Sequence, residues 1–374
     1  WLNYQSPTFN LLGKFAEHTQ QDYFFRNFLP SANSTTGSLS SMMISSPQRP
    51  IGNFLTESEF LQVPFRSSPA RIFAKAGYET HFIYGGNPGW RDMNKFARFQ
   101  GFEHVEGEVD VEKKLGSLKE RHDWGIFDED LFQYIKLTLQ EAKRPQMLLV
   151  MTTTNHPPYQ VPSSFHAEDQ IMPDELLKNL TADVMISQQR FKTYRYSMDS
   201  LGNLMSEIKS SPLAEKTIVA ATGDHGFLLV HFKDSQLLQK WSVPFYLYLP
   251  AELKTEIAPY GLNSQSFAAH MNVMPTLYDL SLSKTDYDSI GYSLLDNKRP
   301  VFASHDSGLM AGPWGAVQIM GARETAYFDW KANPTDKYGE LVGSQENDER
   351  KAMATRYRAM MSLLDFYFIS EKKH

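Results

Sequence analysis

The chain of 374 residues contains no cysteine. Disulfide bonds, thiol catalysis and cysteine-ligated zinc sites are therefore excluded, although this absence fits either side of a membrane. No apolar run approaches the roughly 18 residues of a membrane-spanning helix, and no secretory signal peptide is recognisable. The basic residues are scattered and the net charge is −6, so nothing in the composition favours nucleic-acid binding.

The apolar residues are sufficient for a sizeable core. Along the chain, short continuous apolar runs alternate with segments in which apolar residues recur at helical spacing. Hydrophobic residues make up 41% of the chain and aromatic residues 13%. Short apolar runs at 78–84, 147–151, 218–221 and 243–249 predict strands, and helical spacing predicts helices over 67–76, 128–141, 185–210, 267–282 and 346–367. This alternation predicts an α/β fold, a doubly wound, mostly parallel sheet with helices on both faces. We expect residues 1–300 to form the main domain. Residues 301–374 add a small antiparallel part and a terminal helix to the same globule.

The stretch Gly223-Asp224-His225-Gly226 follows the predicted strand 218–221. Ligands of open α/β sheets bind beyond the carboxyl ends of the strands, and the flanking glycines let the backbone approach whatever is bound. A carboxylate next to an imidazole at such a place is a candidate site for a divalent metal such as zinc or manganese. The alternative is a polar turn without chemistry.

Three further segments place polar residues where ligands could bind. Trp90 and Arg91 follow the predicted strand 78–84, and an arginine beside an aromatic ring can hold a phosphate or sulfate. Asn155 and His156 follow the predicted strand 147–151. A helix is expected to start near 37–44, where free backbone N–H groups can hold an anion and a nearby hydroxyl can act as a nucleophile. A salt-bridged loop, a structural histidine and an ordinary Ser/Thr-rich cap are the alternatives.

Taken in chain order, these motifs resemble a known family. The family that they resemble comprises the extracellular catalytic domains of lipoteichoic acid synthase and related phosphoglycerol transferases, within the alkaline phosphatase and sulfatase superfamily. The resemblance covers residues 1–300 and rests on Thr35-Thr-Gly-Ser-Leu, Tyr84-Gly-Gly, Trp90-Arg91-Asp92, Thr154-Asn-His-Pro-Pro-Tyr159, Gly223-Asp-His-Gly226, Val243-Pro-Phe, Met274-Pro-Thr and Gly291-Tyr-Ser-Leu-Leu.

The resemblance implies a metal-dependent enzyme that forms a phospho-threonine intermediate. Thr35 would be the nucleophile, and one Mn²⁺ or Zn²⁺ ion would be held by Thr35, Asp224 and His225. Arg91 and His156 would bind the substrate phosphate, and Trp90 would line the pocket. The implied substrate is a phospholipid head group or an envelope glycan. The implied location is outside the cytoplasm, in a parent protein anchored to the membrane. His231 receives no role.

The resemblance leaves several alternatives open. The family supplies a further acidic metal ligand on a first strand, which would lie about ten residues before Trp1, so we expect that the sequence is a piece of a longer protein. Ser45-Ser-Pro-Gln-Arg49 fits the Ser-x-Pro-x-Arg pattern of sulfatases, whose serine becomes formylglycine, and would make Ser45 a rival of Thr35. A non-catalytic, anion-binding relative is the third possibility. The sequence does not separate a transferase from a phosphodiesterase.

Overall fold

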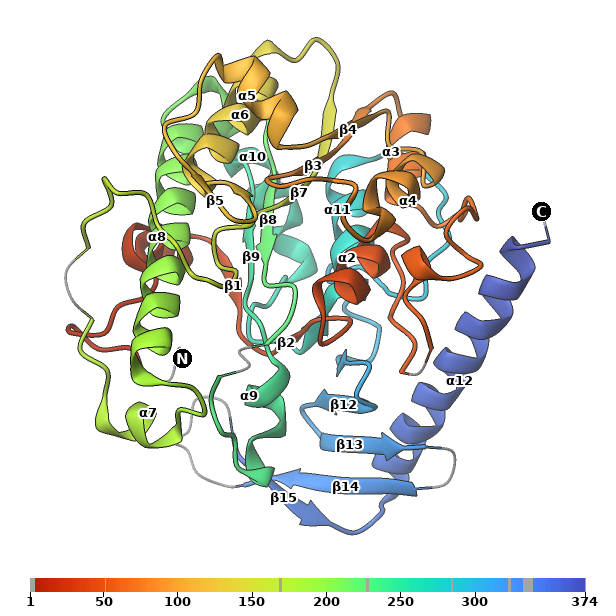
Figure 1. The fold of residues 1–374 in the computed structure, drawn as a ribbon. Coiled ribbons are helices and arrows are strands. Elements are labelled where there is room, and N and C mark those ends of the chain that lie inside the picture. The colour runs from red at the N-terminus through yellow and green to blue at the C-terminus, as the bar shows by residue number, and fades with distance from the viewer. Residues whose placement is uncertain are drawn as a thin grey trace.

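Helices surround a set of short central strands, and an antiparallel sheet lies below them (Figure 1). This computed structural model describes residues 4–50, 52–167, 170–226, 229–283, 285–321, 324–331 and 339–373. The α-helices are α1 (Ala16–Gln21), α2 (Thr35–Met43), α3 (Pro69–Lys75), α4 (Met93–Phe99), α5 (Glu108–Leu115), α6 (Asp128–Glu141), α7 (Asp174–Asn179), α8 (Val184–Lys209), α9 (Leu237–Trp241), α10 (Ala251–Ile257), α11 (Val273–Ser281) and α12 (Asp348–Glu371).

The described strands form one sheet of five strands, two sheets of three and two pairs. They are β1 (Tyr23–Phe25), β2 (Phe28–Leu29), β3 (Glu79–Tyr84), β4 (His104–Glu106), β5 (Arg121–His122), β6 (Gly125–Ile126), β7 (Gln146–Met151), β8 (Val219–Thr222), β9 (Phe245–Tyr248), β10 (Ala268–Ala269), β11 (Ala303–Ser304), β12 (Leu309–Gly312), β13 (Gly315–Met320), β14 (Glu324–Trp330) and β15 (Leu341–Ser344).

The predicted α/β fold is confirmed, with one correction to the strand directions. Strands β4, β3 and β7 pair in parallel, in that order. The second group has the order β1-β9-β8, and both of its pairings are antiparallel. A short, wholly apolar run such as β9 shows that both faces of a strand are covered, but it carries no information about the direction of its neighbours.

Both faces of β9 are covered by helices. Phe245 and Leu247 pack with residues of α10 and α11. Tyr246 and Tyr248 point to the other face and pack with α8. Alternate side chains of a strand point to opposite faces, so this run of buried aromatic and aliphatic residues produces the expected helix–strand–helix layering.

Two helices begin at other residues than the sequence pattern indicates. Helix α2 begins at Thr35 rather than near Gly37, because the side chain of Ser34 caps it by accepting a hydrogen bond from the N–H of Gly37 over 3.3 Å. Within the predicted helix 267–282, residues Ala268–Ala269 form strand β10 and α11 begins at Val273. Pro275 lies in the first turn of α11, where a helix does not need the missing N–H group.

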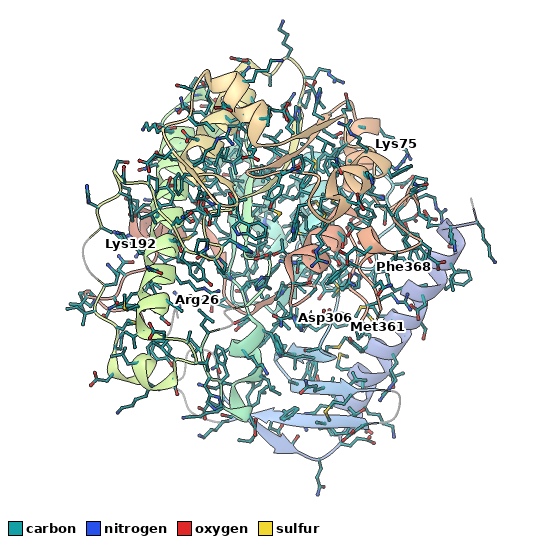
Figure 2. The ribbon with its side chains drawn as sticks, viewed as in Figure 1. Arg26, Lys75, Lys192, Asp306, Met361 and Phe368 are labelled. Carbon is teal, nitrogen blue, oxygen red and sulfur yellow. The ribbon has the colours of Figure 1, made fainter. Side chains whose placement is uncertain are left out.

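The C-terminal part is an antiparallel sheet in the order β11-β12-β13-β14-β15, covered by α12. Met353, Tyr357 and Met360 of α12 pack on this sheet, whereas the ring of Phe368 lies 5.2 Å from that of Phe65 in the main body. Figure 2 shows Met361 and Phe368 on the side of α12 that faces the body. Helix α12 therefore joins both parts into one packed unit, and the division at residue 300 stays a prediction. Among the described helices, none combines the length and the apolarity that crossing a membrane requires.

Candidate active site

The end of β8 and the start of α2 bring Thr35, Asp224 and His225 together. The Thr35 hydroxyl donates a hydrogen bond to Oδ2 of Asp224 over 2.5 Å. Nε2 of His225 lies 3.6 Å from the same carboxylate oxygen. The side chains of Asp224 and His225 are 43% and 22% exposed, so a ligand from solvent can reach this point. The structure thus brings the three predicted metal ligands together, although Thr35 and Asp224 are 189 residues apart in the chain.

Thr35 is the first residue of α2, at the positive end of the helix dipole. The first turn of a helix presents unpaired backbone N–H groups that favour a bound anion. The turn is closely packed: a Cβ atom at Gly37 would lie 2.7 Å from Cβ of Ala32. Glycine is therefore needed at position 37, and the backbone that carries Thr35 is held firmly.

His270 connects the two segments that carry Thr35 and Asp224, and the sequence motifs gave it no role. Its Nδ1 accepts a hydrogen bond from the N–H of Ser31 over 3.1 Å, and its Nε2 donates to the carbonyl of Gly223 over 3.0 Å. The side chain is 3% exposed, and this burial lowers the pKa of His270 to about 4. The ring is therefore neutral at pH 7 and protonated on Nε2, as both hydrogen bonds require.

The C-terminal part adds two further titratable groups beside the Thr35 segment. Asp306 follows β11, and its carboxyl accepts hydrogen bonds from the backbone at Asn33 and Ser307; burial still raises the pKa of Asp306 to about 6. His305 stacks on Trp241 with ring centroids 4.7 Å apart, and burial lowers its pKa to about 3. Figure 2 shows Asp306 between α2 and the C-terminal sheet. The segment before Thr35 therefore contacts a part of the chain that the sequence motifs did not include.

His156 follows β7, as the sequence predicts, and lies on the surface. Its ring centroid is 4.0 Å from that of Trp124, and its Nδ1 donates to the carbonyl of Pro157 over 2.9 Å. The neighbouring Asn155 accepts a hydrogen bond from the Thr193 hydroxyl of α8 over 3.1 Å. His156 is thus oriented by an aromatic neighbour, with Nε2 turned away from the backbone contact.

Arg190 of α8 is a second residue that the sequence motifs missed. The side chain is 8% exposed, and its guanidinium carbon lies 5.7 Å from the ring centroid of Tyr159. Burial lowers the pKa of Arg190, and the negative charge of Asp224 opposes that effect. A buried arginine whose charge reaches Asp224 adds positive potential beside the Thr35–Asp224 pair. The signal in the sequence was an arginine among the apolar positions of a helix, where charged residues are rare.

Trp90 and Arg91 lie in a short 3₁₀ turn, Trp90–Asp92, which contacts a second 3₁₀ turn, Leu55–Glu57. Arg91 forms an ion pair with Glu57, and its guanidinium lies 5.9 Å from the Trp90 ring centroid. The segment of Glu57 reaches α2, because the ring of Phe54 lies 3.3 Å from the position of a Cβ at Gly37. In the described part of the chain, no direct contact joins Arg91 to Thr35 or Asp224, so the predicted phosphate contact stays a prediction.

Ser45 and His231 lie apart from the group formed by Thr35, Asp224 and His225. Ser45 lies two residues beyond Met43, the last residue of α2, and Met43 is roughly 12 Å along the helix from Thr35 at 1.5 Å per residue. It is 2% exposed and lines a cavity of about 240 Å³ together with Arg66 and Tyr367. His231 is exposed, and its backbone N–H donates to the carbonyl of Asn179 over 2.7 Å.

The donor atoms at this site suit a divalent cation. The hydroxyl of Thr35 and Nε2 of His225 both face Oδ2 of Asp224, and hydroxyl, carboxylate and imidazole are ligands that Mn²⁺ and Zn²⁺ accept. The Thr35–Asp224 contact of 2.5 Å is at the short end for two oxygens. A cation between them would replace this hydrogen bond, so the residues present fit the predicted metal.

Comparison with known proteins gives the same picture of the fold. The profile of the Sulfatase family matches residues 2–281. Phosphoglycerol transferase I of Salmonella typhi is 21% identical over 158 residues, which cover 41% of this chain and 19% of the relative. The match therefore spans about a fifth of the length of that relative.

Three solved structures share the fold. The lipoteichoic acid synthase LtaP of Listeria monocytogenes superposes with a TM-score of 0.75 at 14% identity, over 96% of this chain and 86% of that one. A protein of the alkaline phosphatase superfamily from Vibrio parahaemolyticus gives 0.70 at 17% identity, over 97% and 83%. The C-terminal periplasmic domain of EptC from Escherichia coli, in complex with zinc, gives 0.54 at 14% identity, over 92% and 88%. Because the family profile covers most of the chain, this protein belongs to the Sulfatase family and has the alkaline phosphatase-like α/β fold.

Proposed function

We propose that this domain is a metal-dependent phosphoryl-transfer enzyme. In this proposal it is a phosphoglycerol or related head-group transferase, or a phosphodiesterase, that works through a phospho-Thr35 intermediate. The observation that carries the proposal is the 2.5 Å hydrogen bond from the Thr35 hydroxyl to Asp224 at the N-terminus of α2. It joins a nucleophile, a metal-ligating carboxylate and an anion-binding helix terminus.

Thr35 and its neighbours supply the parts that a substituted-enzyme reaction needs. Asp224 orients the Thr35 hydroxyl, and the α2 N-terminus stabilises negative charge on the attacked phosphate. A divalent cation held by Thr35, Asp224 and His225, Mn²⁺ or Zn²⁺, would lower the pKa of the hydroxyl and neutralise phosphate charge. His270 holds the segment before Thr35 and the segment before Asp224 together through its hydrogen bonds to Ser31 and Gly223.

The reaction has two displacements at phosphorus. In the first, the Thr35 hydroxyl loses its proton, its oxygen forms a bond to phosphorus, the bond to the departing alcohol breaks, and that alcohol takes up a proton. In the second, an acceptor alcohol or water attacks phosphorus and loses its proton, the bond from phosphorus to the Thr35 oxygen breaks, and Thr35 takes up a proton. An alcohol acceptor makes the enzyme a transferase, and water makes it a phosphodiesterase.

The surrounding cationic and aromatic side chains favour an anionic substrate. Arg190 adds positive charge whose effect reaches Asp224, and in this proposal Arg91 and His156 bind the substrate phosphate and Trp90 lines the pocket, as the motif resemblance implies. The named activity of the Salmonella relative and the LtaP neighbour favour a phospholipid head group or an envelope glycan as substrate. The periplasmic EptC neighbour favours an extracytoplasmic site of action, in a protein anchored to the membrane.

A sulfatase that uses Ser45 is less compatible with the geometry. Ser45 is buried at the end of α2 remote from Asp224 and His225, whereas a sulfatase nucleophile must reach the metal. A non-catalytic anion-binding protein would require neither the hydroxyl of Thr35 nor a metal.

The two nucleophiles are separated by matched alanine variants. The assay follows hydrolysis of bis(p-nitrophenyl) phosphate with Mn²⁺ or Zn²⁺, and transfer from a phosphatidylglycerol vesicle, and looks for a phosphate adduct by intact mass. We expect Thr35→Ala to lose activity and adduct by about 10³-fold or more, Thr35→Ser to keep part of both, and Ser45→Ala to keep them fully. Full activity in Thr35→Ala would refute the proposal. Loss in Ser45→Ala together with sulfate-ester cleavage would favour the sulfatase, and wild-type protein that neither binds metal nor forms an adduct would favour the non-catalytic relative.

A further inference from the structure

A second group of metal-ligating side chains lies on the parallel sheet, away from Asp224. Glu79 and His81 are two residues apart on β3 and share one face, and His81 pairs in register with His104 of β4. One potential ligand atom from each of Glu79, His81 and His104 lies within 4.8 Å of the others. The group is on the first half of β3, and His81 is roughly 10 Å along the strand from its last residue, Tyr84.

His81 is held in the arrangement of a metal-ligating histidine. Its Nδ1 contacts the carboxylate of Glu106 at 2.8 Å. Its Nε2 is buried and has no hydrogen-bond partner among the described residues, and the residue is only 6% exposed. Metal-bound histidines typically donate one ring nitrogen to a carboxylate and use the other for the metal. A buried nitrogen without a partner is unfavourable, and a cation would satisfy it.

His104 and Glu79 complete the group and leave it open to solvent on one side. Nε2 of His104 lies 2.9 Å from Oε1 of Glu79, and the His104 side chain is 43% exposed. The rings of His81 and His104 are stacked, with centroids 4.4 Å apart. The side-chain amide of Gln146 donates a hydrogen bond to Oε2 of Glu79 over 2.8 Å, so the other oxygen, Oε1, is the one on the side of His104.

We propose that Glu79, His81 and His104 bind a second divalent cation, for which Zn²⁺ is the best match. Two imidazoles and one carboxylate form a common zinc ligand set, with ligand distances of about 2.0–2.2 Å. At such distances the ligand atoms around one ion lie roughly 3.3 Å from one another. Side-chain rotations must therefore shorten the present separations of up to 4.8 Å between these atoms. Glu106 orients His81, and water completes the coordination. The ion would link the edge strand β4, through His104, to Glu79 and His81 of β3.

The competing explanation is a pair of metal-free histidine–glutamate contacts. Zinc binding decides between the two, because a cation needs both histidines as neutral ligands, whereas ion pairs need no metal. The catalytic site would also bind zinc, so the test uses Asp224→Asn to weaken that site while leaving the second group intact.

The experiment measures bound zinc by mass spectrometry of the metal-stripped and reloaded protein, together with the thermal midpoint with and without ZnCl₂. The variants are Asp224→Asn, the double variant Asp224→Asn/His104→Gln, and the control Asp224→Asn/His166→Gln, which changes an exposed histidine outside the group. We expect Asp224→Asn and the His166 control to bind one equivalent of zinc and to gain thermal stability from it. We expect the double variant with His104→Gln to lose both.

Two results would overturn the proposal. One is that Asp224→Asn binds no zinc. The other is that the His104→Gln double variant keeps the zinc content and thermal gain of its parent. Because His104 is partly exposed, His104→Gln avoids a cavity in the core. Circular dichroism of the zinc-free variants checks that each is folded, and Glu79→Gln provides a second substitution with the same expected loss.

Discussion

The positioning role of His270 can be tested through its effect on both stability and activity. In the unfolded chain a histidine has a pKa near 6.5, whereas burial lowers the pKa of His270 to about 4. Between these values the unfolded state binds more protons than the folded state, so stability falls as the pH falls below about 6.5. From the two pKa values, the loss between pH 7 and pH 5 is about 2 kcal/mol for this one side chain.

Two substitutions divide the contacts of His270. The amide nitrogen of His270→Gln can still reach the carbonyl of Gly223, and the amide oxygen of His270→Asn can still accept from the N–H of Ser31. Each variant leaves one buried backbone group unpaired, at a cost of about 1–3 kcal/mol. Because Gly223 adjoins Asp224, we expect His270→Gln to retain more turnover than His270→Asn, with both below the wild type.

The assay is urea unfolding of the wild type and both variants at pH 7 and pH 5, together with turnover of a phosphodiester at pH 7. The wild type should lose about 2 kcal/mol more than either variant on acidification, because only the wild type carries the buried imidazole. If all three proteins lost equal stability between the two pH values, the buried neutral histidine would be refuted. Equal turnover of wild type and His270→Asn would refute the alignment of Asp224 through Gly223.

Three further predictions rest on separate contacts. Asp22, whose side chain is 1% exposed and contacts Lys209 and Lys254 at 2.6 Å, should be needed for stability. We expect Asp22→Ala to lower the free energy of unfolding by about 3–5 kcal/mol in chemical denaturation, whereas a change near zero, as expected for exposed Glu17→Ala, would contradict the buried ion pairs. Gly291→Ala places a Cβ 1.8 Å from the carbonyl of Met271, which follows His270, and should destabilise the protein by at least about 1–3 kcal/mol and reduce turnover. Gly343→Ala, where a Cβ meets nothing within 4 Å, is the matched control, and equal melting temperatures of the two variants would contradict the close packing. Arg190→Gln should raise KM for an anionic phosphodiester about tenfold or more through the lost charge, while Lys192→Gln, at an exposed position on the same helix, should not. An unchanged KM in Arg190→Gln would place Arg190 outside the binding region.

Local sequence patterns were sufficient for the elements whose shape depends on neighbouring residues. Helix α6 has the predicted bounds Asp128–Glu141, and β3 and β7 differ from the predicted strands by one residue at one end. The apolar run before Gly223 ends at a turn, because the glycine and the polar pair do not continue its apolar pattern. The strand β8 that it forms is only partly buried. Neighbouring residues alone therefore assign Asp224 and His225 to the end of a strand.

The direction in which neighbouring strands pair and the residue at which a helix starts were not predictable from the local apolar pattern. Strand β9 is apolar at every position, so its sequence predicts burial but not that β1 and β8 run antiparallel to it. The start of α2 depended on one cap, the Ser34 side chain, which a stretch of several Ser and Thr residues does not single out.

The sequence by itself determined the α/β layering, and its motifs predicted Thr35, Asp224 and His225 as the group for a metal. Only the tertiary structure decided which other side chains surround the segments that carry them. His270, Asp306 and Arg190 come from segments that carry no motif, and their roles follow from hydrogen bonds, burial and charge effects across long stretches of chain. The same holds for His81 and His104, because strand register, not spacing in the sequence, brings them together. Neighbouring residues determine helices, strands and turns, whereas the side chains that surround a site depend on how distant segments pack in the core.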